Sequence, residues 1–307
     1  MNAVRSAVIV DKIRHVIARR SRSNLTIFQD NDGEIAALPL VARNDGSEGT
    51  PSLWARRQAK HEQRGLRRGA IYCARIELRD VNDRDVMPPE PPKVLTAPPH
   101  GRVLVVVPHA DDESLGCGGT IALHRRQGDR VKVVVVTDGA AGDALGYYAG
   151  QDYVALRRTE ARRAAAILGV EELVFWDYPD GRLAEADDLS ERLRILFDTD
   201  RPDIVYRPSA REIHPDHWAL GVGVEAALRQ HAAPVQDYCY EIWATVTPTH
   251  VIDITPVWEV KRKAVEQYES QLRYNDYLHM VAGLNAYRTI HLTSARYVEA
   301  YQEVRRG

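Results

Sequence analysis

From residue 101 onward the chain alternates short apolar runs with longer amphipathic stretches. The apolar runs fall at residues 103–107, 131–136, 173–176 and 204–206. Runs of this length without polar alternation are typical of strands that are buried on both faces of a sheet. The intervening stretches have the spacing of amphipathic helices and fall at residues 119–127, 152–168 and 189–197. This order predicts an α/β fold, namely a Rossmann-like, doubly wound and mostly parallel sheet with helices on both faces.

The amino-terminal part follows a different pattern. Two apolar segments, 25–28 and 35–41, flank the turn sequence Asn31-Asp-Gly33 and predict a β-hairpin. Residues 70–78 predict a further strand, and the basic stretch 54–68 predicts a solvated helix or loop.

A proline-rich stretch at residues 87–93 separates the two parts and predicts an extended linker, because proline continues neither a helix nor a central strand. We therefore expect a small N-terminal extension over residues 1–95, whose residues indicate no chemistry, and a second domain over residues 96–307.

The composition narrows the class of protein. A formal net charge of −2 over 307 residues argues against a general nucleic-acid binder and favours small-molecule partners. The three cysteines are odd in number and widely separated, which fits a reducing compartment without a disulfide framework. No apolar run approaches the roughly 20 residues that an integral membrane segment needs, so we expect a cytoplasmic protein. A homo-oligomer is compatible with this composition.

Ligands of doubly wound sheets bind beyond the carboxyl ends of the strands, so the residues that follow each apolar run deserve inspection. The first run is followed by Pro108-His109-Ala110-Asp111-Asp112-Glu113. Such crowded ionisable groups at the end of a buried strand need compensation, which a divalent cation supplies. Adjacent Asp111 and Asp112 point in different directions, so one of them faces the metal beside His109 and the other is free to handle protons.

The last apolar run leads into His214-Pro-Asp-His217. Pro215 suits the first turn of a helix, which places His214 near its N-cap and His217 one turn further on the same face. One histidine and one aspartate from the first loop and one histidine from this segment form a donor set of two nitrogens and one oxygen. That set suits zinc with one position open for water, which indicates catalysis.

These motifs carry a family resemblance. PHADDE at 108–113, TDG at 137–139, YPDG at 178–181 and HPDH at 214–217 resemble the LmbE/PIG-L family of zinc-dependent N-acetylglucosamine deacetylases. The resemblance spans about residues 102–304 and leaves out the amino-terminal part. Ala110 stands where the commoner form of the motif has proline, a change that removes no ligand.

The resemblance implies a role for each motif residue. It implies Zn²⁺ held by His109, Asp112 and His217, with Asp111 as general base and His214 as a cation that stabilises the oxyanion. Either Asp111 or His214 protonates the departing amine. The products are acetate and the free amine of an N-acetylated amino sugar or sugar conjugate.

Four further residues have both a functional and a structural interpretation. Glu113 orients a metal ligand or is a surface carboxylate. Arg157 holds a sugar hydroxyl or phosphate, or forms a salt bridge with Glu160. Asp180 and Asp138 bind substrate, or serve ordinary turns. Gly116, Gly118 and Gly119 are assigned to close backbone packing rather than to a dinucleotide loop, and His15, His61 and His124 are expected at the surface.

Three alternative functions have their own signatures. An amidase acting on a thiol-sugar conjugate or another N-acyl small molecule would use the same residues. A non-catalytic metal-binding domain would need neither Asp111 nor His214. A nucleotide-dependent oxidoreductase would need a complete GxGxxG sequence, which the glycines at 116–119 do not form.

Overall fold

The computed structural model describes residues 25–29, 35–39 and 90–305. The chain divides into two compact units, Met1–Pro88 and Pro89–Gly307. In the first unit, β1 (Leu25–Gln29) and β2 (Ile35–Pro39) pair antiparallel, as the predicted hairpin requires. The predicted turn at 31–33, the segments expected at 54–68 and 70–78, and His15 and His61 lie outside the described residues.

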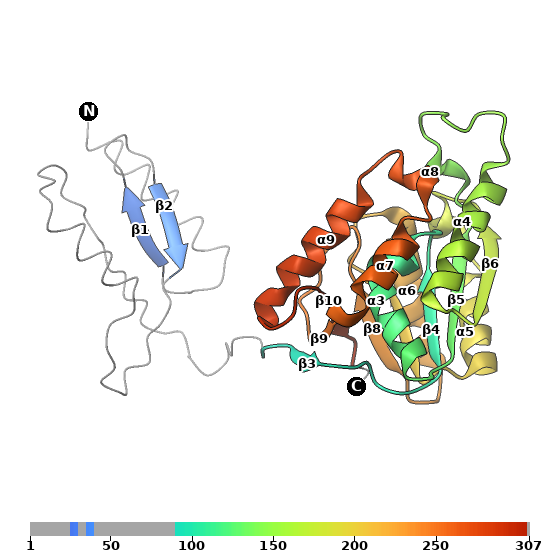
Figure 1. Cartoon of the computed structure of the whole chain (residues 1–307). Coiled ribbons are helices and arrows are strands. Elements are labelled where there is room, and N and C mark those ends of the chain that lie inside the picture. Colours follow the sequence, from blue (N-terminus) through green and yellow to red (C-terminus); the bar gives the residue numbers. More distant parts are fainter. Residues whose placement is uncertain (1–24, 30–34, 40–89, 306–307) are drawn as a thin grey trace, which may run out of the picture. The chain divides into compact units, whose positions relative to one another are not determined.

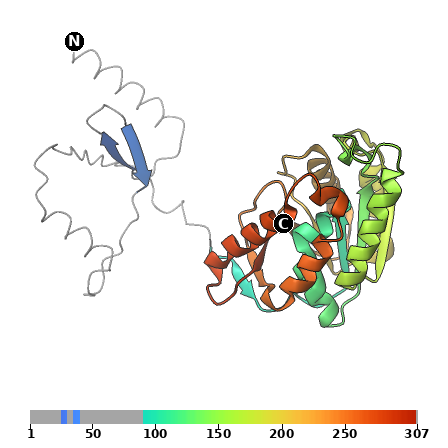
Figure 2. The same cartoon turned by 45° about the horizontal axis from the view of Figure 1, so that its top comes forward.

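The second unit is built on an eight-stranded sheet in the order β3-β9-β10-β8-β7-β4-β5-β6. Figures 1 and 2 show the sheet and its helices from two directions. Neighbours from β8 to β6 run parallel, whereas β10 is antiparallel to both β8 and β9. The sheet is therefore mostly parallel, as predicted. Its strands are β3 (Lys93–Leu95), β4 (Val103–Val107), β5 (Val131–Thr137), β6 (Glu172–Tyr178), β7 (Ile204–Pro208), β8 (Gln236–Tyr240), β9 (His250–Asp253) and β10 (Val298–Glu303).

Strand β3 lies within the segment that we expected to belong to the extension. It pairs in parallel with β9, so Lys93–Leu95 is part of the main sheet. The sequence did not predict this strand, because prolines flank its three residues and so short a run shows no alternation of apolar and polar positions.

Helices cover both faces of the sheet, as a doubly wound fold requires (Figure 1). One apolar core joins one face to α3, α4 and α7, and a second core joins the opposite face to α5 and α6. The strands read as continuous apolar runs because both faces are buried; all five residues of β4 are buried. The helices are α3 (Asp112–Arg126), α4 (Tyr153–Leu168), α5 (Leu189–Asp200), α6 (Pro215–Gln230), α7 (Trp258–Val265), α8 (Glu269–Leu272) and α9 (Tyr277–Tyr287).

Helix α3 begins earlier than predicted and is interrupted near its start. Cys117 has non-helical dihedral angles (φ −144°, ψ 21°), so the first turn is offset from the rest of the helix. A Cβ on Gly116 would lie 2.7 Å from Tyr240 Cδ2, and one on Gly119 would lie 2.6 Å from Ile254 Cγ2. The predicted close backbone packing of these two glycines is confirmed, and the helix start predicted at residue 119 is wrong, because α3 begins at Asp112.

A buried ion pair satisfies the polar groups that the interruption frees. Glu299 accepts hydrogen bonds from the backbone N–H groups of Gly119 (2.9 Å) and Thr120 (2.8 Å). Lys261 Nζ donates to the carbonyl oxygen of Leu115 (2.8 Å) and lies 2.6 Å from Glu299 Oε1. An interrupted helix inside the core is stable because these side chains replace its missing backbone bonds.

His124 on α3 is buried, so its predicted surface position is wrong. Its Nδ1 lies 2.7 Å from Asp129 Oδ2 and its Nε2 lies 3.0 Å from the Tyr206 hydroxyl.

Within the part of the chain that the structure describes, no helix has both the length and the apolar character that crossing a bilayer requires.

Candidate active site

The two predicted clusters meet at the carboxyl ends of β4 and β7. These two strands are neighbours in the sheet. After β4 the chain continues through α3 to β5 on one side of the pair, and after β7 it continues through α6 to β8 on the opposite side. The strand order therefore reverses between them and leaves a crevice there. His109 follows β4, and His214 is the N-cap of α6 with Pro215 as its first residue, as predicted.

The three histidines converge in this crevice. The ring centroids of His109 lie 5.0 Å from His214 and 5.4 Å from His217. One ring nitrogen from each of the three lies within 4.8 Å of the others. Asp112 Oδ2 lies 3.3 Å from His109 Nδ1 and 3.2 Å from His217 Nε2. The predicted ligand set of His109, Asp112 and His217 thus comes together from two strand ends.

The donor set fits a divalent cation. His217 is fully buried, and neither of its ring nitrogens has a hydrogen-bond partner among the described residues. Burial alone would raise the pKa of Asp112, but the nearby charge of His217 and the hydrogen bond and charge of His109 outweigh it and lower that pKa. A buried carboxylate beside two imidazoles, one of which has no hydrogen-bond partner among the described residues, matches the ligand chemistry of zinc.

Asp111 occupies a strained position beside this set. Its backbone has φ 138°, which a residue with a side chain rarely adopts. Its Oδ2 lies 3.6 Å from Nη2 of the buried Arg157, which also donates to the carbonyl oxygen of Ala110. Burial raises the pKa of Asp111 to about 8, against the opposing charge of Arg157. The Asp111 carboxylate is thus separate from the three predicted ligands and held against a cation.

His214, for which the resemblance implies an oxyanion-stabilising role, uses one ring nitrogen to cap α6. Its Nδ1 accepts the backbone N–H of Asp216 (3.3 Å), which assigns the proton of the neutral imidazole to Nε2. Burial and the nearby His109 and His217 lower its pKa, which favours the neutral form. Because His214 lines the cavity, the neutral ring is a hydrogen-bond donor there.

Glu113 is almost completely buried, so its interpretation as a surface carboxylate is wrong. Its Oε2 accepts the backbone N–H of Asp111 (3.3 Å), and its Oε1 accepts the hydroxyls of Ser114 (2.6 Å) and Tyr268. Glu113 therefore holds the strained backbone that carries Asp111.

The predicted substrate-binding residues divide into two kinds. Asp180 lines the cavity, and its Oδ1 lies 3.0 Å from His109 Nε2. Asp138 Oδ1 accepts the N–H groups of Ala140 (3.0 Å) and Asp180 (3.2 Å), which matches the turn interpretation.

Arg157 lines the cavity too. Its alternative salt-bridge partner, Glu160, instead accepts the N–H (2.8 Å) and hydroxyl (2.6 Å) of Ser270.

Sequence reasoning missed the role of Asp216, the third residue of HPDH. It is fully buried, and its Oδ2 lies 3.2 Å from His109 Nε2 and accepts the N–H of Gly181 (2.7 Å). Its Oδ1 accepts the N–H of Leu183 (3.0 Å). Burial raises its pKa, but the bonds to His109 and to these backbone groups prevail and lower the pKa to about 2. A carboxylate paired with a ligating histidine fixes the orientation of the imidazole.

The histidines and carboxylates of the candidate site line a cavity of about 240 Å³. Its polar lining comprises His109, Asp111, Asp112, Arg157, Asp180, His214 and Gln271, and its apolar lining includes Leu115, Ile242, Trp243 and Tyr277. Polar side chains that converge in one concavity, with apolar side chains beside them, are typical of a small-molecule site.

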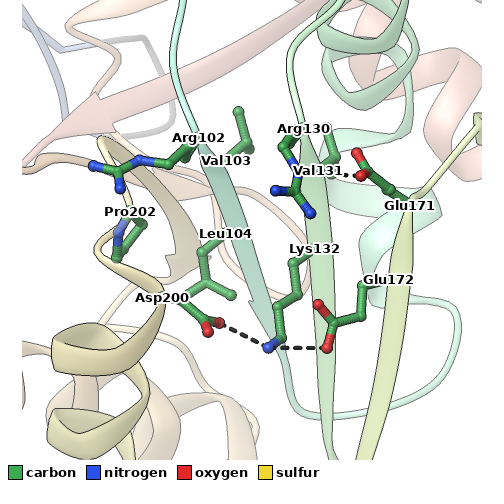
Figure 3. Close-up of a pocket in the computed structure, with 10 residues that line it drawn as sticks. All are labelled: Arg102, Val103, Leu104, Arg130, Val131, Lys132, Glu171, Glu172, Asp200 and Pro202. Atoms are coloured by element: carbon green, nitrogen blue, oxygen red, sulfur yellow. Dashed lines mark hydrogen bonds and ion pairs between the residues drawn. The ribbon is translucent and has the colours of Figure 1, made fainter.

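A second cavity, of about 150 Å³, lies at the opposite, amino ends of β4 and β5 (Figure 3). Its charged groups form ion pairs, and Arg102 pairs with Asp203 outside the lining. Lys132 Nζ lies 3.1 Å from Glu172 Oε1 and 2.8 Å from Asp200 Oδ2, and Arg130 Nε lies 3.1 Å from Glu171 Oε1. The mutually neutralised charges and the position at the amino ends of the strands distinguish this cavity from the candidate active site.

Comparison with known proteins agrees with this assignment. Residues 104–228 match the family described as PIG-L: GlcNAc-PI de-N-acetylase. Diacetylchitobiose deacetylase from Thermococcus kodakarensis is 32% identical over 190 residues, covering 55% of this chain and 70% of that protein. 4-Oxalmesaconate hydratase from Pseudomonas putida is 29% identical over 236 residues, covering 67% of this chain and 90% of that protein.

A deacetylase is also found among the solved structures with a similar fold. N,N'-diacetylchitobiose deacetylase from Pyrococcus horikoshii, solved with an inhibitor, superposes with a TM-score of 0.58 at 26% identity, covering 66% of this chain and 83% of that one.

The fold and the cluster at its switch point define an α/β enzyme whose chemistry is carried by histidine and carboxylate side chains. The chain belongs to the PIG-L family, described as GlcNAc-PI de-N-acetylase.

Proposed function

We propose that the chain hydrolyses the acetamide of an N-acetylated amino sugar or sugar conjugate, with Zn²⁺ held by His109, Asp112 and His217. The observation that carries the proposal is the fully buried His217: its Nε2 lies 3.2 Å from Asp112 Oδ2, and its Nδ1 has no hydrogen-bond partner among the described residues. The names of the similar deacetylases, which act on diacetylchitobiose, supply the substrate class.

Each side chain of the site then has a chemical task. When bound, zinc supplies Lewis acidity, which polarises an amide carbonyl and makes a water molecule easier to deprotonate. Asp111 accepts the proton of the attacking water, and Arg157 keeps the carboxylate in place.

His214 donates its Nε2–H to the carbonyl oxygen as negative charge develops there. The carbon–nitrogen bond breaks, the proton held by Asp111 passes to the amine, and acetate leaves with the second oxygen.

A second function is favoured by the hydratase from Pseudomonas putida, whose match covers the larger share of this chain. Hydration adds water across a carbon–carbon double bond, and the same general base and metal would serve it. Acetate release and loss of a conjugated double bond, followed by ultraviolet absorbance, distinguish the two reactions.

Metal analysis and acetate release from N-acetylglucosamine and diacetylchitobiose test the proposal. Asp111→Asn should keep one zinc per chain and lose at least about 100-fold in kcat, the range of a general base. His217→Ala should lose the metal.

The exposed Asp187 and His279 offer matched controls, Asp187→Asn and His279→Ala, which should leave metal content and turnover unchanged. A zinc-replete wild-type enzyme that releases no acetate from these sugars or from a thiol-sugar acetamide would refute the proposed reaction.

A further inference from the structure

One aromatic residue of the cavity is unused by the proposed chemistry. Trp243 follows β8 in the connection to β9 and lines the cavity, yet 44% of its surface remains exposed. Single exposed apolar residues are common and need no explanation by themselves. Its position beside the reacting groups is what separates Trp243 from the other exposed aromatic residues.

The Trp243 ring is held in a defined orientation. It stacks on His214 with ring centroids 5.8 Å apart and an angle of 26° between the planes. His214 is itself fixed, because its Nδ1 accepts the N-cap hydrogen bond of α6. An indole that is anchored on one ring and open to the cavity offers a rigid apolar face at little entropic cost.

The cavity has the two kinds of surface that a sugar ring presents. A hexopyranose has hydroxyls around its edge and C–H groups on its faces. Asp180 and Arg157 offer hydrogen-bonding partners for the edge, whereas Trp243 offers an aromatic surface for a face. A chain acting on acetamides without a sugar would gain little from this arrangement.

We propose that Trp243 is the stacking platform for a hexopyranose ring of the substrate and so determines the preference of this enzyme for sugar acetamides. This inference rests on the proposed function for its substrate class. It adds a residue and a binding mode that the metal cluster does not require.

The binding test uses glucosamine and N-acetylglucosamine with the zinc-loaded enzyme, by calorimetry. Trp243→Ala should raise the Kd of both sugars about 10-fold. Trp243→Phe should keep both Kd values within about 3-fold of wild type, because an aromatic face remains. Trp218→Ala is the matched control, since Trp218 is 46% exposed and absent from the cavity lining. Equal affinities for wild type and Trp243→Ala, or no sugar binding by wild type, would overturn the proposal.

Kinetics separate stacking from a mere effect on His214. Trp243→Ala should raise KM for N-acetylglucosamine and lower kcat/KM for this sugar substrate by a larger factor than kcat/KM for the sugar-free probe N-acetylethanolamine. An equal loss with both probes would show that Trp243 acts through His214 and would overturn the stacking role. If the wild type releases no acetate, the proposed function fails, while the sugar Kd values still decide the role of Trp243.

Discussion

Replacing Glu299 by glutamine tests the interruption of α3. The carboxylate accepts from Lys261, from the N–H groups of Gly119 and Thr120, and from the Tyr301 hydroxyl (2.8 Å). Glutamine turns one of the two acceptor oxygens into a donor and leaves the buried ammonium without its counter-charge. Breaking a buried ion pair in this way costs about 3–5 kcal/mol of unfolding free energy. For a unit of this size that corresponds to a fall in Tm of about 6–20 °C.

Chemical denaturation of Glu299→Gln, Lys261→Met and the double variant would measure the cost. The double variant should lose less than the sum of the single variants, by about 1–3 kcal/mol, because it leaves no unpaired buried charge. Lys263→Met is the matched control, since Lys263 is exposed on the same helix and should change stability by less than about 0.5 kcal/mol. A loss below about 1 kcal/mol in Glu299→Gln would refute the view that this pair supports the interrupted helix.

Two other positions give independent tests of packing and of pH dependence. Gly119→Ala should lower the unfolding free energy by about 1–3 kcal/mol, because the new Cβ would lie 2.6 Å from Ile254. Gly283→Ala is the control: nothing lies within 4 Å of its new Cβ, so the same denaturation assay should find the unfolding free energy unchanged or higher. Burial raises the pKa of Asp129, but hydrogen bonds led by that of His124 prevail and lower it from 3.8 to about 2. The stability that Asp129 contributes is therefore present above pH 3.8 and is lost as the pH falls toward 2. Asp129→Asn should flatten the fall in stability between about pH 4 and 2, measured by urea unfolding, and an unchanged pH dependence would contradict the assigned network.

The sequence predicted the layout of the site because strand ends and helix starts are local features. An apolar run followed by His109 and Asp112, and a proline behind His214, are each visible within a few residues. Their meeting then followed from the topology of a doubly wound sheet.

Buried polar partners were harder to predict because they are distant in sequence. Lys261 and Glu299, and His124 and Tyr206, look like ordinary surface or core residues until the fold brings them together. A polar residue on a helix predicts exposure unless its partner is known. The start of α3 was predicted too late for a related reason, since the side chains that stabilise its interrupted first turn, Lys261 and Glu299, are distant in sequence.

The backbone of Asp111 has a consequence for engineering. A left-handed conformation there disfavours every residue with a side chain, and glycine would relieve the strain. Selection for heat resistance alone is therefore expected to yield variants with glycine at position 111. These variants should have a higher Tm and a lower turnover. Libraries meant to improve the durability of this enzyme should hold codon 111 constant.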